Sequence, residues 1–246
     1  MEATLKLLAS RVPPPVRISF KDGFNFRYKE KNIHQALVQK LARLISSLHA
    51  ALLLLEHGFV QEQASLQRVL DEIHEDITFL SFSVIFDDTT KLHLDYLDAF
   101  WKEELGITPN IENIKKPSIP RKKIHAYIAR IEGADMNPSR GVELSRIISK
   151  TYSGYVHAAS PYIMDMYCGE PPYFHVKGML NTEFHHDHKV DLWNYFYRSI
   201  IVFCITAKAF GDEDLFVKIS NFTKEFAQLS GKDYSKPYPY SKHQFT

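Results

Sequence analysis

Two side chains near the middle of the sequence and one farther along have the types that anion chemistry uses. Arg68 and Glu72 are four residues apart, so on a helix they lie on one face and can form an ion pair. Such a pair would position the guanidinium and leave its other N–H groups for an anion. His157 can exchange a proton with a phosphate or a ribose hydroxyl, because histidine titrates near neutral pH. We therefore treat Arg68, Glu72 and His157 as one candidate cluster, and add Arg146 from the same predicted helix face as His157.

The same residues also have an ordinary structural interpretation. Pairs such as Arg68 and Glu72 are common on exposed helix surfaces and stabilise a helix by only a few tenths of a kcal/mol. Ala64 and Phe79 lie on the same side of the helix, however, which favours a second packing layer or a cleft over open solvent. In the structural interpretation, His157 caps backbone carbonyls at the end of its own helix.

The element that would position Arg68 and Glu72 is a pair of long helices between residues 32 and 86. Apolar residues recur every three or four positions in both halves of this stretch, as one buried helix face requires. Gly58 separates the halves and can adopt the left-handed conformation that ends a helix. The connection is short, so the two helices must be antiparallel neighbours.

The segment from Val16 to Tyr28 alternates apolar and polar residues, which predicts a β-hairpin. A three-residue loop, with Gly23 in the left-handed position, would pair Phe20 with Phe24 and Ile18 with Phe26. This register puts the apolar residues on one face, which we expect to dock on the helices. A short extended segment at Phe174 and Val176 is a candidate to pair with this hairpin.

From these elements we predict a mainly α protein, a multi-helix bundle built on the antiparallel helical hairpin. We expect one domain over residues 1–246, in which residues 1–31 add the β-hairpin, residues 32–230 form the bundle and residues 231–246 form a tail. At 246 residues and 45% hydrophobic content, the chain is long enough to bury a sizeable core.

Composition excludes several classes of protein. Thirty basic and twenty-nine acidic residues nearly cancel, so the overall charge indicates neither a nucleic acid nor an anionic membrane as partner. Two distant cysteines exclude a disulfide framework and favour a reducing compartment. The apolar runs are shorter than the roughly 18 residues of a membrane span. We expect a soluble, cytoplasmic protein without a membrane partner.

A histidine-rich run, residues 185–188, suggests a metal site, but consecutive helical residues point about 100° apart and cannot all converge. A di-iron bundle would use Glu-x-x-His motifs. The chain offers Asp71-x-x-His74, with Asp in place of Glu, and Glu183-x-x-His186, which faces away from the apolar stripe of its helix. We predict no metal ligands and no cofactor, and keep a metal-binding bundle as a further alternative.

A basic cluster at residues 115–123, which includes Arg121, is either a solvated loop and helix start or an electrostatic footprint for phosphate. The sequence contains no glycine-rich dinucleotide motif, P-loop, Gly-x-Ser-x-Gly elbow or His-Glu-x-x-His motif. Sequence motifs therefore leave open whether the protein is an enzyme.

The run from Leu52 to Gly58, the next helix with Arg68 and Glu72, and Tyr155-Val156-His157 together resemble an uncharacterised bacterial all-helical family often grouped with HEPN-type bundles. The resemblance covers roughly residues 33–160. HEPN ribonucleases commonly carry Arg, four to six residues, then His. Arg68 and His74 have this spacing, but six helical residues turn them about 120° apart. The resemblance therefore implies His157, from another helix, as the partner of Arg68 in metal-independent RNA cleavage.

Two functions remain open. The first is an interaction or scaffold protein that forms a two-fold homodimer, the commonest type of oligomer. The second is a HEPN-like ribonuclease or nucleotide-binding module that uses Arg68, Glu72, His157 and Arg146, with RNA or a nucleotide as partner. The two functions predict different results for His157→Ala. The variant loses an activity only if the protein is a ribonuclease or nucleotide-binding module.

Overall fold

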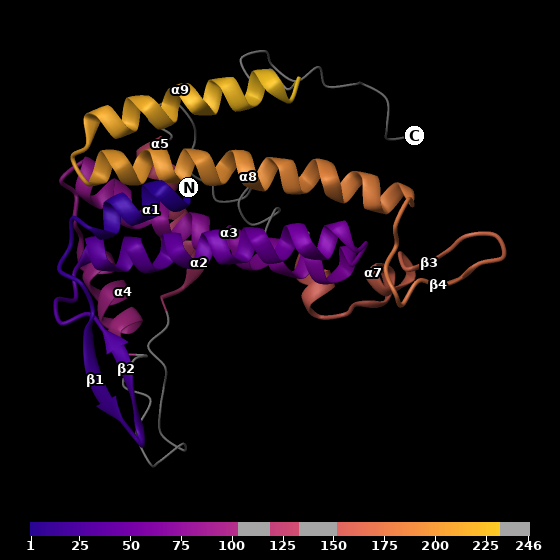
Figure 1. The fold of residues 1–246 in the computed structure, drawn as a ribbon, viewed down its shortest axis with the longest axis horizontal. Coiled ribbons are helices and arrows are strands. Elements are labelled where there is room, and N and C mark those ends of the chain that lie inside the picture. The colour runs from indigo at the N-terminus through magenta and orange to yellow at the C-terminus, as the bar shows by residue number, and fades with distance from the viewer. Residues whose placement is uncertain (103–118, 133–151, 232–246) are drawn as a thin grey trace.

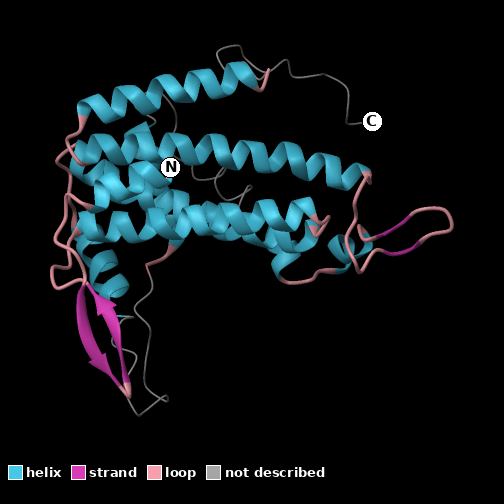
Figure 2. Cartoon of the chain, viewed as in Figure 1, coloured by secondary structure: helices cyan, strands magenta, loops and turns pink. Residues whose placement is uncertain are grey.

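The structure, a computed structural model, describes residues 1–102, 119–132 and 152–231. The protein is mainly α-helical and carries a small N-terminal β-hairpin, which confirms the predicted fold class (Figures 1 and 2). The elements are α1 (Glu2–Ala9), β1 (Val16–Phe20), β2 (Gly23–Arg27), α2 (Ile33–Glu56), α3 (Val60–Ile85), α4 (Lys91–Lys102), α5 (Arg121–Glu132), α7 (Ser160–Met164), β3 (Tyr167–Cys168), β4 (Tyr173–Phe174), α8 (Glu183–Ala209) and α9 (Glu213–Leu229). Residues 152–156 form a further helical turn before α7.

The helical hairpin of α2 and α3 forms as the sequence predicts. The side chain of Asn32 accepts hydrogen bonds from the backbone N–H groups of His34 and Gln35, and so caps the start of α2. Gly58 lies between the helices with φ of 75°. Its carbonyl accepts a 2.7 Å hydrogen bond from the N–H of Met179, which ties the turn to the segment before α8. The turn at Gly58 is thus the one that the sequence predicts, and the Asn32 cap begins α2.

The core lies where α3 packs against α2 on one side and against α8 on another, and α9 covers α8 (Figure 1). The fully buried side chains include, from α2, α3 and α8, Leu37, Leu41, Leu44, Leu48, Leu70, Ile77, Leu80 and Phe203. Phe79 and Ala64, on the other side of α3, are also fully buried. Helix α3 is thus packed on both sides, as the interpretation with a second packing layer requires.

Among the described residues, one helix, α2, is long and apolar enough to cross a membrane by length and composition alone. Its apolar face is occupied within the bundle, because α2 packs against α1, α3 and α8. Core helices of soluble proteins pass the same test, so this property alone does not indicate a membrane.

The predicted register of the N-terminal hairpin is wrong. Phe20 pairs with Gly23 and Ile18 pairs with Asn25, so the loop is the two residues Lys21 and Asp22, with Lys21 at φ of 50°. This register distributes the apolar side chains over both faces of the hairpin. The reason is that no described helix buries either face: Ile18 is 47% and Phe26 59% exposed, so burial does not select the predicted register.

The extended segment near Phe174 does not pair with the N-terminal hairpin. Strands β3 and β4 pair with each other in a separate two-stranded sheet. Together with the flanking residues they form an arm, residues 165–178, which projects from the end of the bundle opposite to β1 and β2 (Figure 1). The expected contact between the two hairpins is therefore absent.

Candidate functional site

The predicted pair of Arg68 and Glu72 is present on α3. Arg68 Nη2 lies 2.7 Å from Glu72 Oε1, and the two side chains are 22% and 45% exposed. A pair this exposed contributes little to stability. Within the described part of the chain, Arg68 makes no further ion pair or hydrogen bond.

His157 lies in an exposed turn after the helix of residues 152–156. Its backbone N–H donates to the carbonyl of Ser153 at 3.1 Å. Its side chain forms no hydrogen bond with any described residue, so the expected role as a carbonyl cap is not seen, and neither is a contact with Arg68 or Glu72. Arg146, the fourth predicted residue, lies outside the described residues.

One hydrogen bond connects this turn region to the face of α3 that carries Arg68. Gln61 Nε2 donates to the carbonyl of Tyr162 at 2.7 Å. Gln61 precedes Arg68 by seven residues, two helical turns, so both side chains lie on the same face of α3. Helix α7, which follows the turn with His157, is therefore attached to that face two helical turns before Arg68.

A more elaborate polar site lies buried between α3 and α8. Asp71 is 1% exposed, and its two carboxylate oxygens accept hydrogen bonds from Tyr195 Oη at 3.0 Å and from Arg198 Nη1 at 2.8 Å. Burial raises the pKa of the Asp71 carboxyl, while Arg198 and Tyr195 act in the opposite direction. This three-residue network lies inside the interface between the two longest helices that the structure describes.

His74, one turn after Asp71, has a defined tautomer. The hydroxyl of Ser199 donates its single proton to the carbonyl of Tyr195 at 2.7 Å, so it can only accept from His74 Nε2, also at 2.7 Å. The lone pair of His74 is therefore on Nδ1, which is buried without a partner among the described residues. Burial, with help from the charge of Arg198, lowers the pKa of His74 well below 6.5, so the imidazole is neutral at pH 7.

A cavity of about 200 Å³ lies beside this network, lined by polar groups of His74, Glu75, Thr78 and Arg198 and by aliphatic side chains of α5 and α8. It is smaller than the roughly 300–1,000 Å³ of small-molecule sites, but large enough for water. Ser199 is fully buried and already donates its proton to a carbonyl, so it is not placed as a nucleophile. The cavity can hold water beside the network, whereas His74 Nδ1 itself is buried.

The helical turn of residues 152–156 is anchored to α8 by tyrosines. Tyr152 Oη donates to Asp191 at 2.8 Å, and Tyr155 packs edge-on against His188 at 5.9 Å between ring centroids. Burial raises the pKa of Tyr155 to about 12, and the nearby charge of Asp165 makes a smaller contribution in the same direction. These contacts position the residues directly before His157.

Arg121 belongs to a second network and is not part of an open phosphate site. It donates to the carboxylates of Glu75 and Asp76 on α3 and to the carbonyl of Glu72. Lys40 on α2 binds the other oxygen of Asp76 at 2.7 Å. Burial raises the pKa of Asp76, but the two cations outweigh it and hold that pKa below its ordinary value. Arg121 Nη1 and Nη2 are thus engaged within the bundle, so Arg121 does not form part of an open phosphate footprint.

The histidines of the run 185–188 do not converge. His185 Nδ1 accepts from the N–H of Asn181, and its Nε2 donates to the carbonyl of Leu55 at 2.9 Å, at the end of α2. His188 Nδ1 donates to Gln63 Oε1 at 2.7 Å, while His186 is exposed. Over the described ranges, no group of three or more His, Cys, Asp or Glu side chains is arranged to hold a metal ion.

Sequence reasoning missed the buried network of Asp71, Tyr195, Arg198, His74 and Ser199 as a site. The sequence feature that could have indicated this network is the presence of polar residues on the sides of α3 and α8 that face other helices. Asp71 and His74 were noticed only as a possible metal motif. Their partners lie more than 120 residues away in sequence, and local spacing does not reveal them.

The fold and these sites define a mainly α-helical bundle with a buried polar interface and two exposed hairpins. No family model, curated protein or solved structure matches the chain.

Proposed function

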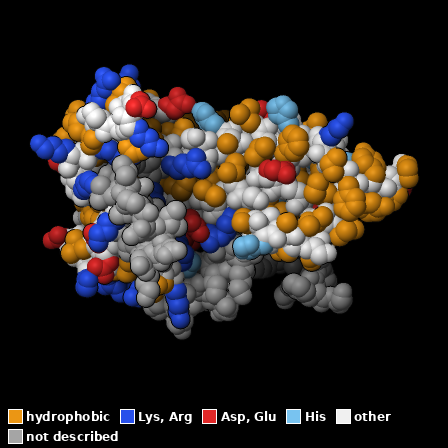
Figure 3. Space-filling model, turned by 90° about the horizontal axis from the view of Figure 1, so that it is seen from below, with side chains coloured by type: hydrophobic (Ala, Val, Ile, Leu, Met, Phe, Trp, Pro, Cys, Tyr) orange, Lys and Arg blue, Asp and Glu red, His pale blue; other side chains and the backbone are white. Residues whose placement is uncertain are grey.

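We propose that this protein is an interaction protein that associates as a homodimer through the arm of residues 165–178. The observation that carries the proposal is the concentration of exposed apolar side chains on the arm and on the residues beside it (Figure 3). They are Val156, Ile163, Met164, Tyr167, Tyr173, Phe174, Val176, Leu180 and Phe184. Contiguous apolar surface of this kind marks interaction sites in soluble proteins.

The geometry of the arm supports this proposal. Its sheet has two strands of two residues each, and Val176 is 69% and Tyr173 56% exposed. The rings of Tyr167 and Phe174 contact each other at 4.8 Å between centroids, yet the two side chains remain 42% and 45% exposed. An isolated two-stranded hairpin is only marginally stable in water, so packing against another surface would stabilise it.

A second copy of the chain suits this surface. From Pro171 to Val176 the arm carries no formally charged residue, so two arms can meet without like-charge repulsion. Glu170 and Lys177 flank this stretch with opposite charges, which an antiparallel two-fold arrangement would bring together. Two-fold interfaces use the same patch on both subunits, and an arm at the end of the bundle is accessible to such pairing.

The test is the mass of the protein in solution at tens of micromolar, measured by light scattering. The wild-type chain is expected to be a dimer and Val176→Asp a monomer, because the carboxylate would be buried without a partner. Leu94→Asp is the matched control, since Leu94 is 58% exposed on α4, and it should remain dimeric. A monomeric wild type, or a dimer that survives Val176→Asp, contradicts the proposal.

The second candidate function is metal-independent RNA cleavage or nucleotide binding of the HEPN type. It is favoured by the guanidinium donors of Arg68 that no described residue engages, and by the hydrogen bond that attaches α7, which follows the turn with His157, to the same face of α3. In this mechanism His157 acts as general acid or base and Arg68 stabilises the charge of the phosphorane-like state, with Arg146 as an additional cation.

This candidate is tested by RNA cleavage and nucleotide binding in the presence of EDTA. His157→Ala should abolish either activity and leave the melting temperature nearly unchanged, because the side chain is exposed. Arg68→Ala should have the same effect on activity. His49→Ala, another exposed histidine, is the control and should retain full activity. Activity that persists in both His157→Ala and Arg68→Ala excludes this mechanism.

A further inference from the structure

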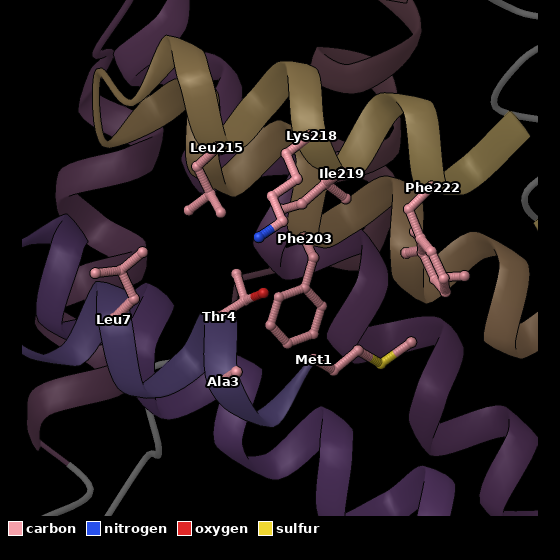
Figure 4. A pocket seen from close by; sticks show the side chains of 10 residues that line it. Met1, Ala3, Thr4, Leu7, Phe203, Leu215, Lys218, Ile219 and Phe222 are labelled. Atoms are coloured by element: carbon pink, nitrogen blue, oxygen red, sulfur yellow. The ribbon is translucent and has the colours of Figure 1, made fainter. Parts of the chain in front are cut away.

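A pocket of about 320 Å³ lies between α1 and α9, over the side of α8 (Figure 4). Its walls are mostly apolar. Phe203 and Ile219 are buried, whereas Leu7 is 42% and Phe222 50% exposed at its edges. The volume of the pocket is at the lower end of the range of small-molecule sites. A ligand that covers its exposed apolar side chains would remove their surface from water, which contributes favourable binding free energy.

One cation points into this apolar pocket. The side chain of Lys218 extends from α9 with its ammonium directed toward Thr4 and Phe203 (Figure 4). Two acidic residues at the start of α9 already have cationic partners, since Asp212 binds Arg11 and Glu213 binds Lys208. Within the described part of the chain, Lys218 forms no ion pair or hydrogen bond. The pocket therefore combines largely apolar walls with the ammonium of Lys218, which has no ion pair with a described residue.

We propose that this pocket binds a free medium-chain alkyl carboxylate. The carboxylate pairs with the ammonium of Lys218 and accepts a hydrogen bond from the Thr4 hydroxyl, and the alkyl chain covers Leu7, Phe203 and Phe222. A charge-assisted hydrogen bond fixes the orientation of the head group, and removal of the chain from water supplies most of the affinity.

The first test is calorimetric titration with hexanoate, octanoate and decanoate, at concentrations below micelle formation. Each added methylene should tighten binding by roughly 4-fold until the pocket is full, because burying one methylene contributes a constant free energy. Decanol, which has the same chain and a neutral head, should bind at least about 10-fold more weakly than decanoate. Affinity that is independent of chain length, or equal for decanol and decanoate, overturns the proposal.

The second test locates the site with two lysine variants. Lys218→Met keeps an apolar stem and removes the charge, so it should bind decanoate and decanol equally. Lys224→Met is the matched control on the same helix, because Lys224 is exposed and does not line the pocket, and it should bind like the wild type. Circular dichroism confirms that both variants are folded. If Lys218→Met binds decanoate as tightly as the wild type, the carboxylate does not bind at this pocket.

Discussion

At the level of single residues, histidine takes several unrelated roles in this chain. His185 joins the end of α2 to the start of α8, and His74 is buried as a neutral base. His157 is exposed and forms no side-chain hydrogen bond with a described residue. A histidine that is free for proton transfer is therefore distinguished from a structural one by its exposure and its partners.

His93 is a buried histidine whose protonation opposes folding. It is 0% exposed, its ring stacks on Phe79 at 4.0 Å between centroids, and its Nδ1 accepts a hydrogen bond from the N–H of Thr90. Burial lowers the pKa of His93 to about 4, whereas the unfolded chain has the ordinary value of 6.5. Between pH 6.5 and 4, only the unfolded state takes up this proton. The stabilising contribution of neutral His93 is therefore complete above pH 6.5 and is lost as the pH falls toward 4.

Replacing His93 by Phe should therefore reduce the acid sensitivity of the fold. Urea unfolding between pH 7 and 4.5 should show a slope against pH that is smaller than that of the wild type by about 1.4 kcal/mol per pH unit, the value for one proton. At pH 7 the variant should be less stable, because the N–H of Thr90 loses its acceptor. His49→Phe, at an exposed site, should keep the slope of the wild type. An unchanged slope in His93→Phe would show that His93 does not cause the loss of stability at acid pH.

At the level of elements, turns with left-handed glycines determine how the long helices meet. Gly58 and Gly211 have similar φ values, 75° and 69°, in the α2–α3 and α8–α9 connections. A Cβ at Gly58 would lie 2.7 Å from the backbone nitrogens of Met179 and Leu180, while nothing lies within 4 Å of a Cβ at Gly211. The first turn thus has a close tertiary contact that the second turn lacks.

This difference predicts unequal effects of the same substitution. Gly211→Ala should destabilise the protein by about 1–2 kcal/mol, because only the left-handed backbone penalises the new side chain. Gly58→Ala should destabilise it by clearly more, since the backbone of residues 179–180 must also move. Chemical denaturation of both variants measures the difference. Equal losses would mean that the segment before α8 moves away at little cost.

At the level of the whole molecule, charged side chains join α5 to the bundle. Arg121 on α5 contacts Glu75 and Asp76 of α3, and Lys40 of α2 also binds Asp76. The carboxylates of Glu75 and Asp76 are 15% and 8% exposed, so they depend on these cations. Although burial raises their pKa values, the contact of His125 Nε2 with Glu75 at 2.9 Å and the charge of Arg121 keep the pKa of Glu75 lowered. The charges of Lys40 and Arg121 do the same for the pKa of Asp76.

Arg121→Met should lower the free energy of unfolding by about 3–5 kcal/mol at pH 7, because it leaves buried carboxylates without their shared cation. The contribution of these two acids is present above their ordinary pKa values of 4.5 and 3.8 and is lost as the pH falls through the lowered ones. The difference between variant and wild type should therefore shrink below about pH 4. Arg130→Met is the control on the same helix, since its pair with Asp88 is largely exposed and should contribute less than about 1 kcal/mol. Equal stability of the two variants would rule out this role of Arg121.

The sequence by itself determined the features that depend on neighbours a few residues apart. Helical periodicity, Gly58 and the short connection predict the α2–α3 hairpin, and the spacing of Arg68 and Glu72 predicts their ion pair. These are interactions within one or two helical turns, so their geometry follows from the helix itself.

Only the tertiary structure decided which distant residues meet. Asp71 binds Tyr195 and Arg198 across more than 120 residues, and the apolar pocket around Lys218 requires α1, α8 and α9 together. The register of β1 and β2 likewise depended on whether a helix covers the hairpin, and none of the described helices buries either face. Pairings of this kind are set by where whole helices pack, because burial selects one arrangement among several that the local pattern permits equally.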